Sequence, residues 1–61
     1  MKLHLYSIRE GYLVEDENYR LLARSATGMW GFTENSDLAH VFATEADAIE
    51  MASRWDPAVT R

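Results

Sequence analysis

Short apolar stretches separated by polar turns make up most of the chain. Each stretch is rich in aromatic, branched or long aliphatic residues and is bounded by Gly, Asn, Asp or Ser, which is typical of strands joined by tight connections. We predict extended segments at residues 2–8, 12–14, 19–23 and 29–33, with a further apolar stretch at 38–43. Turns at Gly11 and Gly28 and a polar loop around Asn18 join them as antiparallel hairpins. Asn18 is the residue suited to a left-handed conformation in that loop.

The hydrophobic period changes at Thr44. Asp47 follows three residues later, and this pair predicts a helix start in which the Thr44 hydroxyl accepts the Asp47 amide. Apolar residues then recur at helical spacing and would form one face, consisting of Ala46, Ile49, Ala52 and Trp55. A helix over residues 45–55 is too short to be stable alone in water, so it must pack on the sheet. We expect Phe42 and Ile49 at the centre of the core.

These elements predict an α+β fold, in which a small antiparallel sheet of three to four strands has one C-terminal amphipathic helix packed on one face. The 61 residues form a single domain, 1–61. A domain of this length buries only about 60% of its unfolded surface. The chain has no cysteine, so neither a disulfide nor a thiolate metal site adds stability. Core packing or self-association must therefore stabilise it.

The charge balance and the hydropathy exclude several classes of function. The net charge is −4 and the pI is about 4.9, which disfavours direct binding to nucleic acid because that binding depends on basic residues. No apolar run approaches the roughly 20 residues that a membrane-spanning helix needs, and no signal-peptide core follows the N-terminus. We therefore expect a cytoplasmic protein.

Candidate catalytic and metal-binding residues are few. His4 and His40 are the only histidines, and they offer no short spacing typical of zinc ligands. The chain contains neither a G-x-S-x-G turn for a serine nucleophile nor a glycine-rich loop for nucleotide phosphates. It is also too short to surround a substrate pocket of about 300 Å³ or more. We expect no enzyme activity, no metal and no cofactor.

Two other features point to protein binding. Acidic residues cluster in two predicted loops and comprise Glu15, Asp16, Glu17, Glu34 and Asp37. The plainer interpretation is a set of solvated loops, and the functional one is an anionic surface that faces a basic partner in place of nucleic-acid phosphates. The chain also has three Tyr, two Trp and two Phe residues, more than so small a core can bury completely. We expect one or two of them, a Tyr together with Trp30 or Trp55, to be available as anchors at an interface.

One combination of residues resembles small phage and prophage accessory proteins. It comprises Gly11-Tyr12-Leu13, Trp30, Phe32-Thr33, Ala39, Val41-Phe42-Ala43-Thr44 and Ala46-Asp47-Ala48. The resemblance covers most of the chain and implies a small antiparallel sheet followed by one helix. It also implies that the protein, if a phage encodes it, is located in the host cytoplasm. Some proteins of this kind are counter-defence inhibitors, anti-CRISPR proteins among them, which act by binding a host protein rather than by catalysis. The resemblance transfers no inhibitory motif to particular residues.

Two hypotheses about function remain. The first is a phage-type accessory protein that binds a protein partner stoichiometrically and inhibits a host defence nuclease complex of the CRISPR or restriction type. The second is a homodimeric structural or regulatory module without inhibitory activity. We predict a homodimer, because a monomer would bury too little apolar surface for its aromatic residues and would leave sheet edges exposed. A strictly monomeric state would favour the inhibitor.

Overall fold

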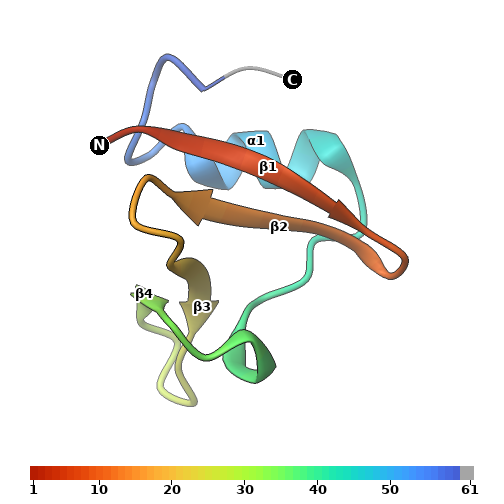
Figure 1. Ribbon diagram of the computed structural model, residues 1–61, viewed down its shortest axis with the longest axis vertical. Coiled ribbons are helices and arrows are strands. Elements are labelled where there is room, and N and C mark those ends of the chain that lie inside the picture. Colours follow the sequence, from red (N-terminus) through yellow and green to blue (C-terminus); the bar gives the residue numbers. More distant parts are fainter. Residues whose placement is uncertain (60–61) are drawn as a thin grey trace.

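The computed structural model describes residues 1–59, which form a four-stranded sheet and one α-helix. The elements are β1 (Leu3–Ile8), β2 (Gly11–Asp16), β3 (Leu21–Arg24), β4 (Trp30–Thr33), the short 3-10 helix η1 (Ser36–Leu38) and α1 (Glu45–Ala52). The strands are antiparallel in the order β1-β2-β3-β4, and α1 lies behind β1 and β2 (Figure 1). The predicted α+β fold is therefore confirmed. No helix in this part of the chain is long and apolar enough to cross a membrane.

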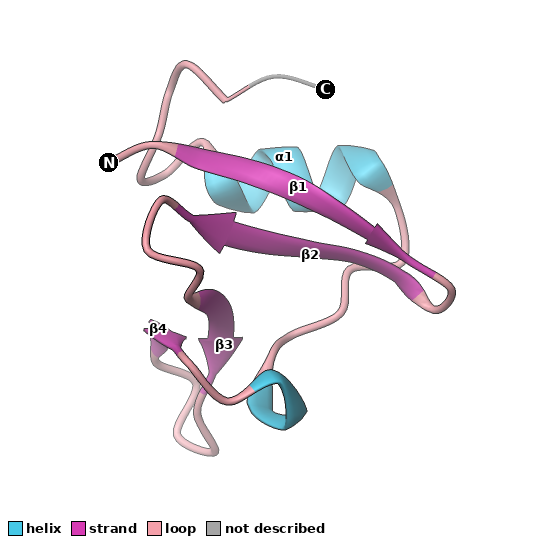
Figure 2. Ribbon diagram, viewed as in Figure 1, coloured by secondary structure: helices cyan, strands magenta, loops and turns pink. Residues whose placement is uncertain are grey.

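The sheet consists of two hairpins that touch over a very short distance. β1 and β2 pair along their whole length, and so do β3 and β4. Between the hairpins, however, β2 and β3 share only the pair of Glu15 and Leu21. The β3–β4 hairpin consequently turns away from β1 and β2 (Figure 2). Part of β2 and part of β3 are left with inner edges that need other hydrogen-bond partners.

Residues 39–42, which we call the bridging segment, supply those partners. At its start the segment runs beside β3, where the His40 amide donates to the Leu22 carbonyl oxygen at 3.0 Å. At its end Phe42 exchanges both backbone hydrogen bonds with Tyr12 of β2, at 2.9 and 2.8 Å. The apolar stretch expected at 38–43 is thus extended, but it pairs only at isolated bridges and spans the two hairpins.

The core lies between α1 and the sheet. Its buried residues are Leu3, Val14, Leu22, Phe42, Ala48 and Ala52. The burial predicted for Phe42 is confirmed, and this side chain carries the bridging segment into the core. The position predicted for Ile49 is wrong, because Ile49 is only half-buried and lies outside the core cluster. Ala46, on the same predicted helix face, is exposed.

The helix is rotated relative to the prediction because its smallest side chains face the sheet. Ala48 and Ala52 are completely buried, and Met51 and Trp55 pack beside them. These residues also recur at helical spacing, so the hydrophobic period fits the observed buried face as well as the predicted face with Ala46 and Ile49. Alanine has a small side chain, so at the contact it lets the helix approach the sheet closely.

Both ends of the helix have identifiable hydrogen bonds. As predicted, the Thr44 hydroxyl accepts the Asp47 amide, at 3.1 Å. The α-helix ends at Ala52, three residues before the predicted end, and a turn continues to Trp55, whose amide donates to the Ala52 carbonyl oxygen at 3.0 Å. Asp56, which follows this turn, connects the C-terminal end of the helix to the sheet, because its Oδ2 accepts the Leu3 amide at 2.9 Å. The Asp56 carboxylate therefore lies against the start of β1.

A close approach of two backbone segments occurs at Gly11. Its φ is +151°, and a Cβ atom there would overlap the carbonyl oxygen of Phe42, the group that accepts the Tyr12 amide. Only glycine lets the bridging segment come this close to β2. Gly31 in β4 is different, because a Cβ atom there would have no heavy atom within 4 Å.

We predict that Gly11→Ala lowers the free energy of unfolding by about 2–4 kcal/mol, because the methyl group must displace the Phe42 backbone from a residue with positive φ. Urea denaturation measures this change. Gly31→Ala is the matched control, for which we expect a change within about 0.5 kcal/mol. Equal losses in the two variants would mean that the close approach at Gly11 does not constrain the fold.

Candidate functional site

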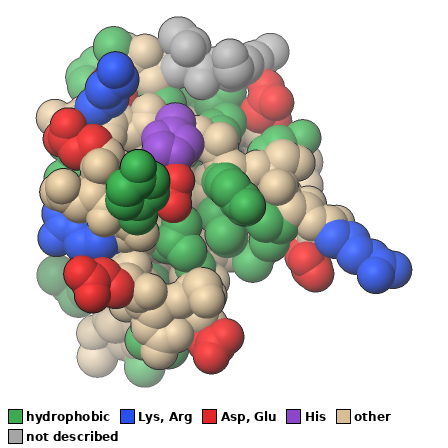
Figure 3. Space-filling view, in the orientation of Figure 1, with side chains coloured by type: hydrophobic (Ala, Val, Ile, Leu, Met, Phe, Trp, Pro, Cys, Tyr) green, Lys and Arg blue, Asp and Glu red, His purple; other side chains and the backbone are tan. Residues whose placement is uncertain are grey.

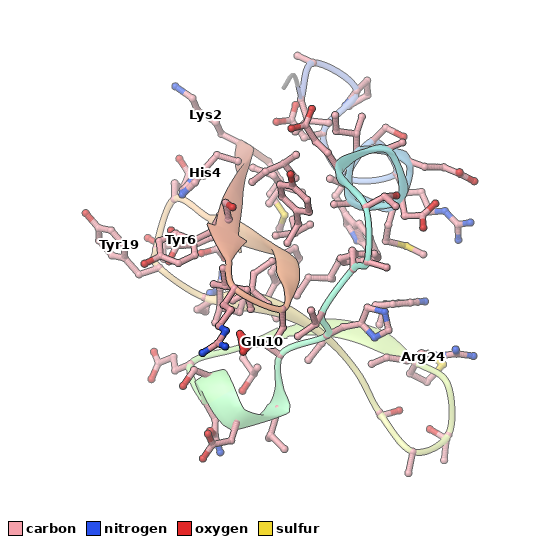
Figure 4. All side chains as sticks on the ribbon, turned by 90° about the vertical axis from the view of Figure 1, so that its right-hand side faces the viewer. Lys2, His4, Tyr6, Glu10, Tyr19 and Arg24 are labelled. Atoms are coloured by element: carbon pink, nitrogen blue, oxygen red, sulfur yellow. The ribbon has the colours of Figure 1, made fainter. Side chains whose placement is uncertain are left out.

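The most exposed aromatic side chains of residues 1–59 lie on the outer face of the β1–β2 hairpin and in the loop that follows it. Tyr6 is 53% exposed, and Tyr19, in the loop between β2 and β3, is 80% exposed. Lys2 and His4 are exposed as well, and these four side chains project to the same side of the molecule in Figure 4. In Figure 3, which shows this side, hydrophobic side chains and a histidine lie close together among acidic and basic ones. We call the surface formed by Lys2, His4, Tyr6, Glu15 and Tyr19 the tyrosine face.

Strand alternation places two of these side chains. Leu3 and Leu5 of β1 belong to or pack against the core, so His4 and Tyr6 point to the opposite face. His4 lies opposite Glu15 of β2, and its Nε2 is 2.6 Å from Glu15 Oε1. The Glu15 side chain is only 17% exposed, whereas that of His4 is 54% exposed. The acceptor is therefore held against the sheet while the imidazole lies at the surface.

Tyr19 has an unusual backbone conformation. Its φ is +63°, and it is the only residue other than glycine with positive φ among those the structure describes. The prediction that Asn18 would take the left-handed position is therefore wrong by one residue. A large aromatic side chain in this region is strained and persists only where its surroundings impose the conformation. Here the Tyr19 amide donates to the Asp16 carbonyl oxygen at 3.2 Å, and the ring is directed into solvent.

The Asp16 carboxylate imposes this loop conformation. Its Oδ1 accepts the amides of Asn18 at 2.9 Å and Arg20 at 2.8 Å, and its Oδ2 accepts Arg20 Nε at 2.9 Å. The residue is only 2% exposed. Burial by itself would raise the pKa of Asp16, but the amides of Arg20 and Asn18 and the charge of Arg20 outweigh it and hold the pKa below its ordinary value of 3.8. The carboxylate is therefore ionised and fully engaged within the fold.

The structure divides the acidic residues that the sequence grouped together. Glu15 and Asp16 were expected in a loop, but both belong to β2, because the strand continues further than its apolar residues indicate. Their hydrogen bonds to His4 and Arg20 give them structural roles. Glu17, Glu34 and Asp37 are exposed, as a solvated acidic surface requires.

The two tryptophans expected as interface anchors are half-buried and lie beside the core. Trp30 contacts His40 edge-to-face at 5.0 Å and stacks on Phe42 at 6.1 Å between ring centroids. The Trp55 ring packs edge-to-face on Phe32 at 5.9 Å. Tyr6 and Tyr19 are far more exposed, and neither was predicted by position as an interface residue. The signals in the sequence were the alternation of Tyr6 with core leucines and the position of Tyr19 next to a polar loop.

Other sites offer less specific chemistry. An open groove of about 430 Å³ lies between the β3–β4 hairpin and η1, where Met29 and Leu38 are exposed. Residues 1–59 contain no group of three or more His, Cys, Asp or Glu side chains placed to hold a metal ion. Of the histidines, His4 pairs with Glu15, and His40 packs against Trp30 and Phe42. The tyrosine face is therefore the surface with the most distinctive geometry.

We predict that Asp16 makes the protein sensitive to acid. A group whose pKa is lowered by folding stabilises the fold above its ordinary pKa of 3.8, and that contribution is lost as the pH falls through the lower, folded value. Asp16→Asn should lower the free energy of unfolding at neutral pH by about 1.5–3 kcal/mol and should flatten its dependence on pH below about 4. Urea denaturation at a series of pH values measures both effects. Glu17→Gln, at the exposed neighbouring position, is the control, and an equally flattened profile for it would contradict the assignment.

We also predict that Tyr19→Asn stabilises the protein by about 0.5–1 kcal/mol, because asparagine adopts the left-handed conformation more readily than tyrosine. The thermal midpoint should rise. Tyr6→Asn, in a strand where tyrosine is favoured, should lower it. A destabilised Tyr19→Asn variant would show that the ring contributes contacts that its exposure does not reveal.

Comparison with known proteins gives no relative from which to assign this surface. No family model matches the chain, and neither a curated protein nor a solved structure is significantly similar to it. The function has to be inferred from the chemistry of the surface.

Proposed function

We propose that this protein acts by stoichiometric binding to another protein, through the tyrosine face. The observation that carries the proposal is Tyr19, a strained residue whose ring is 80% exposed and whose loop is fixed by a buried carboxylate. The strain has no benefit for packing, since the ring contacts mainly solvent. Strained conformations of this kind cluster at functional sites, where they present a side chain in a set position.

The composition of the tyrosine face suits an interface. Tyrosine is enriched among the residues that dominate binding, because it offers a large rigid surface and a hydroxyl group. Tyr6 and Tyr19 supply two such rings, and His4, Glu15 and Lys2 supply polar groups around them. An aromatic centre with a polar rim is the usual anatomy of a protein–protein interface.

The charge of the chain indicates a partner with a basic surface. The net charge is −4, and the exposed acids include Glu17, two residues before Tyr19 in the same loop. Glu34 and Asp37 add exposed negative charge near η1. Exposed charges of this kind act mainly on the rate of encounter, while desolvated aromatic rings determine how long a complex lasts.

The biological role that fits this chemistry is that of a phage-type accessory protein, and inhibition of a host defence nuclease complex is the more specific form of the proposal. Two observations support it. The chain resembles small accessory proteins that work by binding, and its acidic surface is complementary to the basic surfaces with which nucleases hold nucleic acid.

The test begins with affinity capture from a lysate of the cells in which the protein is made, followed by binding measurements on the captured partner. Tyr19→Asn should weaken binding about tenfold or more, mainly by faster dissociation, although the variant is at least as stable as the parent. The combined change of Glu17, Glu34 and Asp37 to their amides should slow association and reduce its dependence on salt.

The control is the double variant Met29→Ala and Leu38→Ala, which alters exposed apolar residues away from the tyrosine face. We expect it to bind normally. If this control loses binding while Tyr19→Asn does not, the groove beside η1 is the binding surface and the proposal is wrong.

A further inference from the structure

We propose that two copies of the chain associate through the outer edge of β1, so that the sheet of one copy continues into the sheet of the other. Self-association goes beyond the binding activity proposed above, although the strand edge that it uses adjoins the tyrosine face and shares Lys2, His4 and Tyr6 with it. β1 is the first strand of the sheet, and within residues 1–59 it pairs only with β2. An edge strand presents backbone amide and carbonyl groups with which another strand can pair.

The direction of these backbone groups follows from hydrogen bonds already described. The Leu3 amide points away from β2, because it donates to Asp56 Oδ2. Backbone groups alternate in direction along an antiparallel strand, so those of Leu5 and Ser7 also point outward. The neighbouring strand agrees, since Tyr12, which lies opposite Ser7, directs its amide away from β1.

Asp56 restricts the part of the edge that can pair. It occupies the Leu3 amide, whereas no bond from the described residues reaches the outward amides of Leu5 and Ser7. The open edge is therefore short and lies on either side of Tyr6. An edge of this length can accept a second strand only in a few registers.

An antiparallel pairing centred on Tyr6 uses the open edge fully. Leu5 then lies opposite Ser7 of the second copy, and each such pair exchanges both backbone hydrogen bonds. A pairing centred on Leu5 would need the Leu3 amide, which Asp56 holds. A pairing centred on Ser7 would place Leu5 opposite Arg9, so two of its hydrogen-bonded pairs would use the turn that follows β1 at Ile8.

The side chains are complementary in the register centred on Tyr6. The two Tyr6 rings lie opposite each other on the outer face, and His4 lies opposite Ile8 of the second copy. Lys2 lies opposite Glu10 of the second copy, so opposite charges meet at both ends of the contact. Figure 4 shows Lys2 and Glu10 near opposite ends of β1, and both are exposed. Aromatic pairs and opposite charges are favourable cross-strand neighbours.

The contact is small, below the roughly 1,200 Å² of a stable interface, so the dimer should dissociate on dilution. Its consequence for the tyrosine face is geometric. The two faces become continuous across the joined sheet, with the Tyr6 pair at the centre and one Tyr19 on each side. A partner with repeated basic sites could then be bound at two points.

Sedimentation equilibrium over a wide range of concentrations tests the proposal, with twice 7.0 kDa as the expected limiting mass. Ser7→Pro removes an outward amide that the monomer does not use, and proline is tolerated on edge strands, so the monomer should fold and dimerisation should be lost. Ser36→Pro is the control, since the first position of η1 accepts proline and lies outside the proposed contact.

A charge exchange tests the register and remains informative if Ser7→Pro fails to fold. Lys2→Glu and Glu10→Lys should each weaken self-association roughly tenfold, because like charges then face each other in both symmetry-related pairs. An equimolar mixture of the two variants restores opposite charges at both ends and should recover the dimer. A mass of 7.0 kDa at concentrations up to the order of 1 mM would overturn the proposal. So would a mixture that associates no better than the separate variants.

Discussion

The buried Asp16 carboxylate is the interaction on which the rest of the arrangement depends. It lies where β2 ends and accepts the amides of Asn18 and Arg20 together with the guanidinium group of Arg20. A buried carboxylate is unfavourable unless its hydrogen-bonding capacity is filled, so the loop around it has one favourable arrangement. That arrangement ends the first hairpin, directs the chain into β3 and leaves Tyr19 at the outside of the turn. A single polar group thus sets both the bend in the sheet and the most exposed aromatic ring.

The bend in the sheet leaves backbone groups of β2 and β3 in need of hydrogen-bond partners, and the bridging segment supplies them. Because β2 and β3 diverge after the pair of Glu15 and Leu21, their facing edges would otherwise lack partners. The bridging segment bonds to both strands and brings Phe42 into the core, and it can do so because Gly11 has no side chain. In so small a domain, close contacts between backbone segments substitute for a larger core. Ala48 and Ala52 act in the same way where the helix meets the sheet.

α1 covers one face of the β1–β2 hairpin, and no α-helix of residues 1–59 covers the opposite face. The covered face holds leucine and valine against the helix, and the opposite face presents Tyr6 and the pair of His4 and Glu15. The aromatic residues are divided accordingly, with Tyr12, Trp30 and Trp55 beside the core and Tyr6 and Tyr19 in solvent. The outer edge of β1 is unpaired as well, since no further strand of residues 1–59 lies beside it. Within the described residues, an exposed face and an unpaired strand edge therefore adjoin each other.

The sequence was sufficient to predict the element order, the helix start at Thr44 and the burial of Phe42, because each depends on local pattern or on a cap within a few residues. It did not determine which helix face is buried, since Ile49 and Ala48 both satisfy a helical period and only the space above the sheet favours alanine. It also grouped Asp16 with its acidic neighbours, although burial and three hydrogen bonds give it a structural role. The extent to which Tyr6 and Tyr19 are exposed depended on tertiary structure, because the sequence signals near them were compatible with burial as well. An aromatic side chain is buried or exposed according to what the rest of the chain places over it, and that is not a property of its neighbours in sequence.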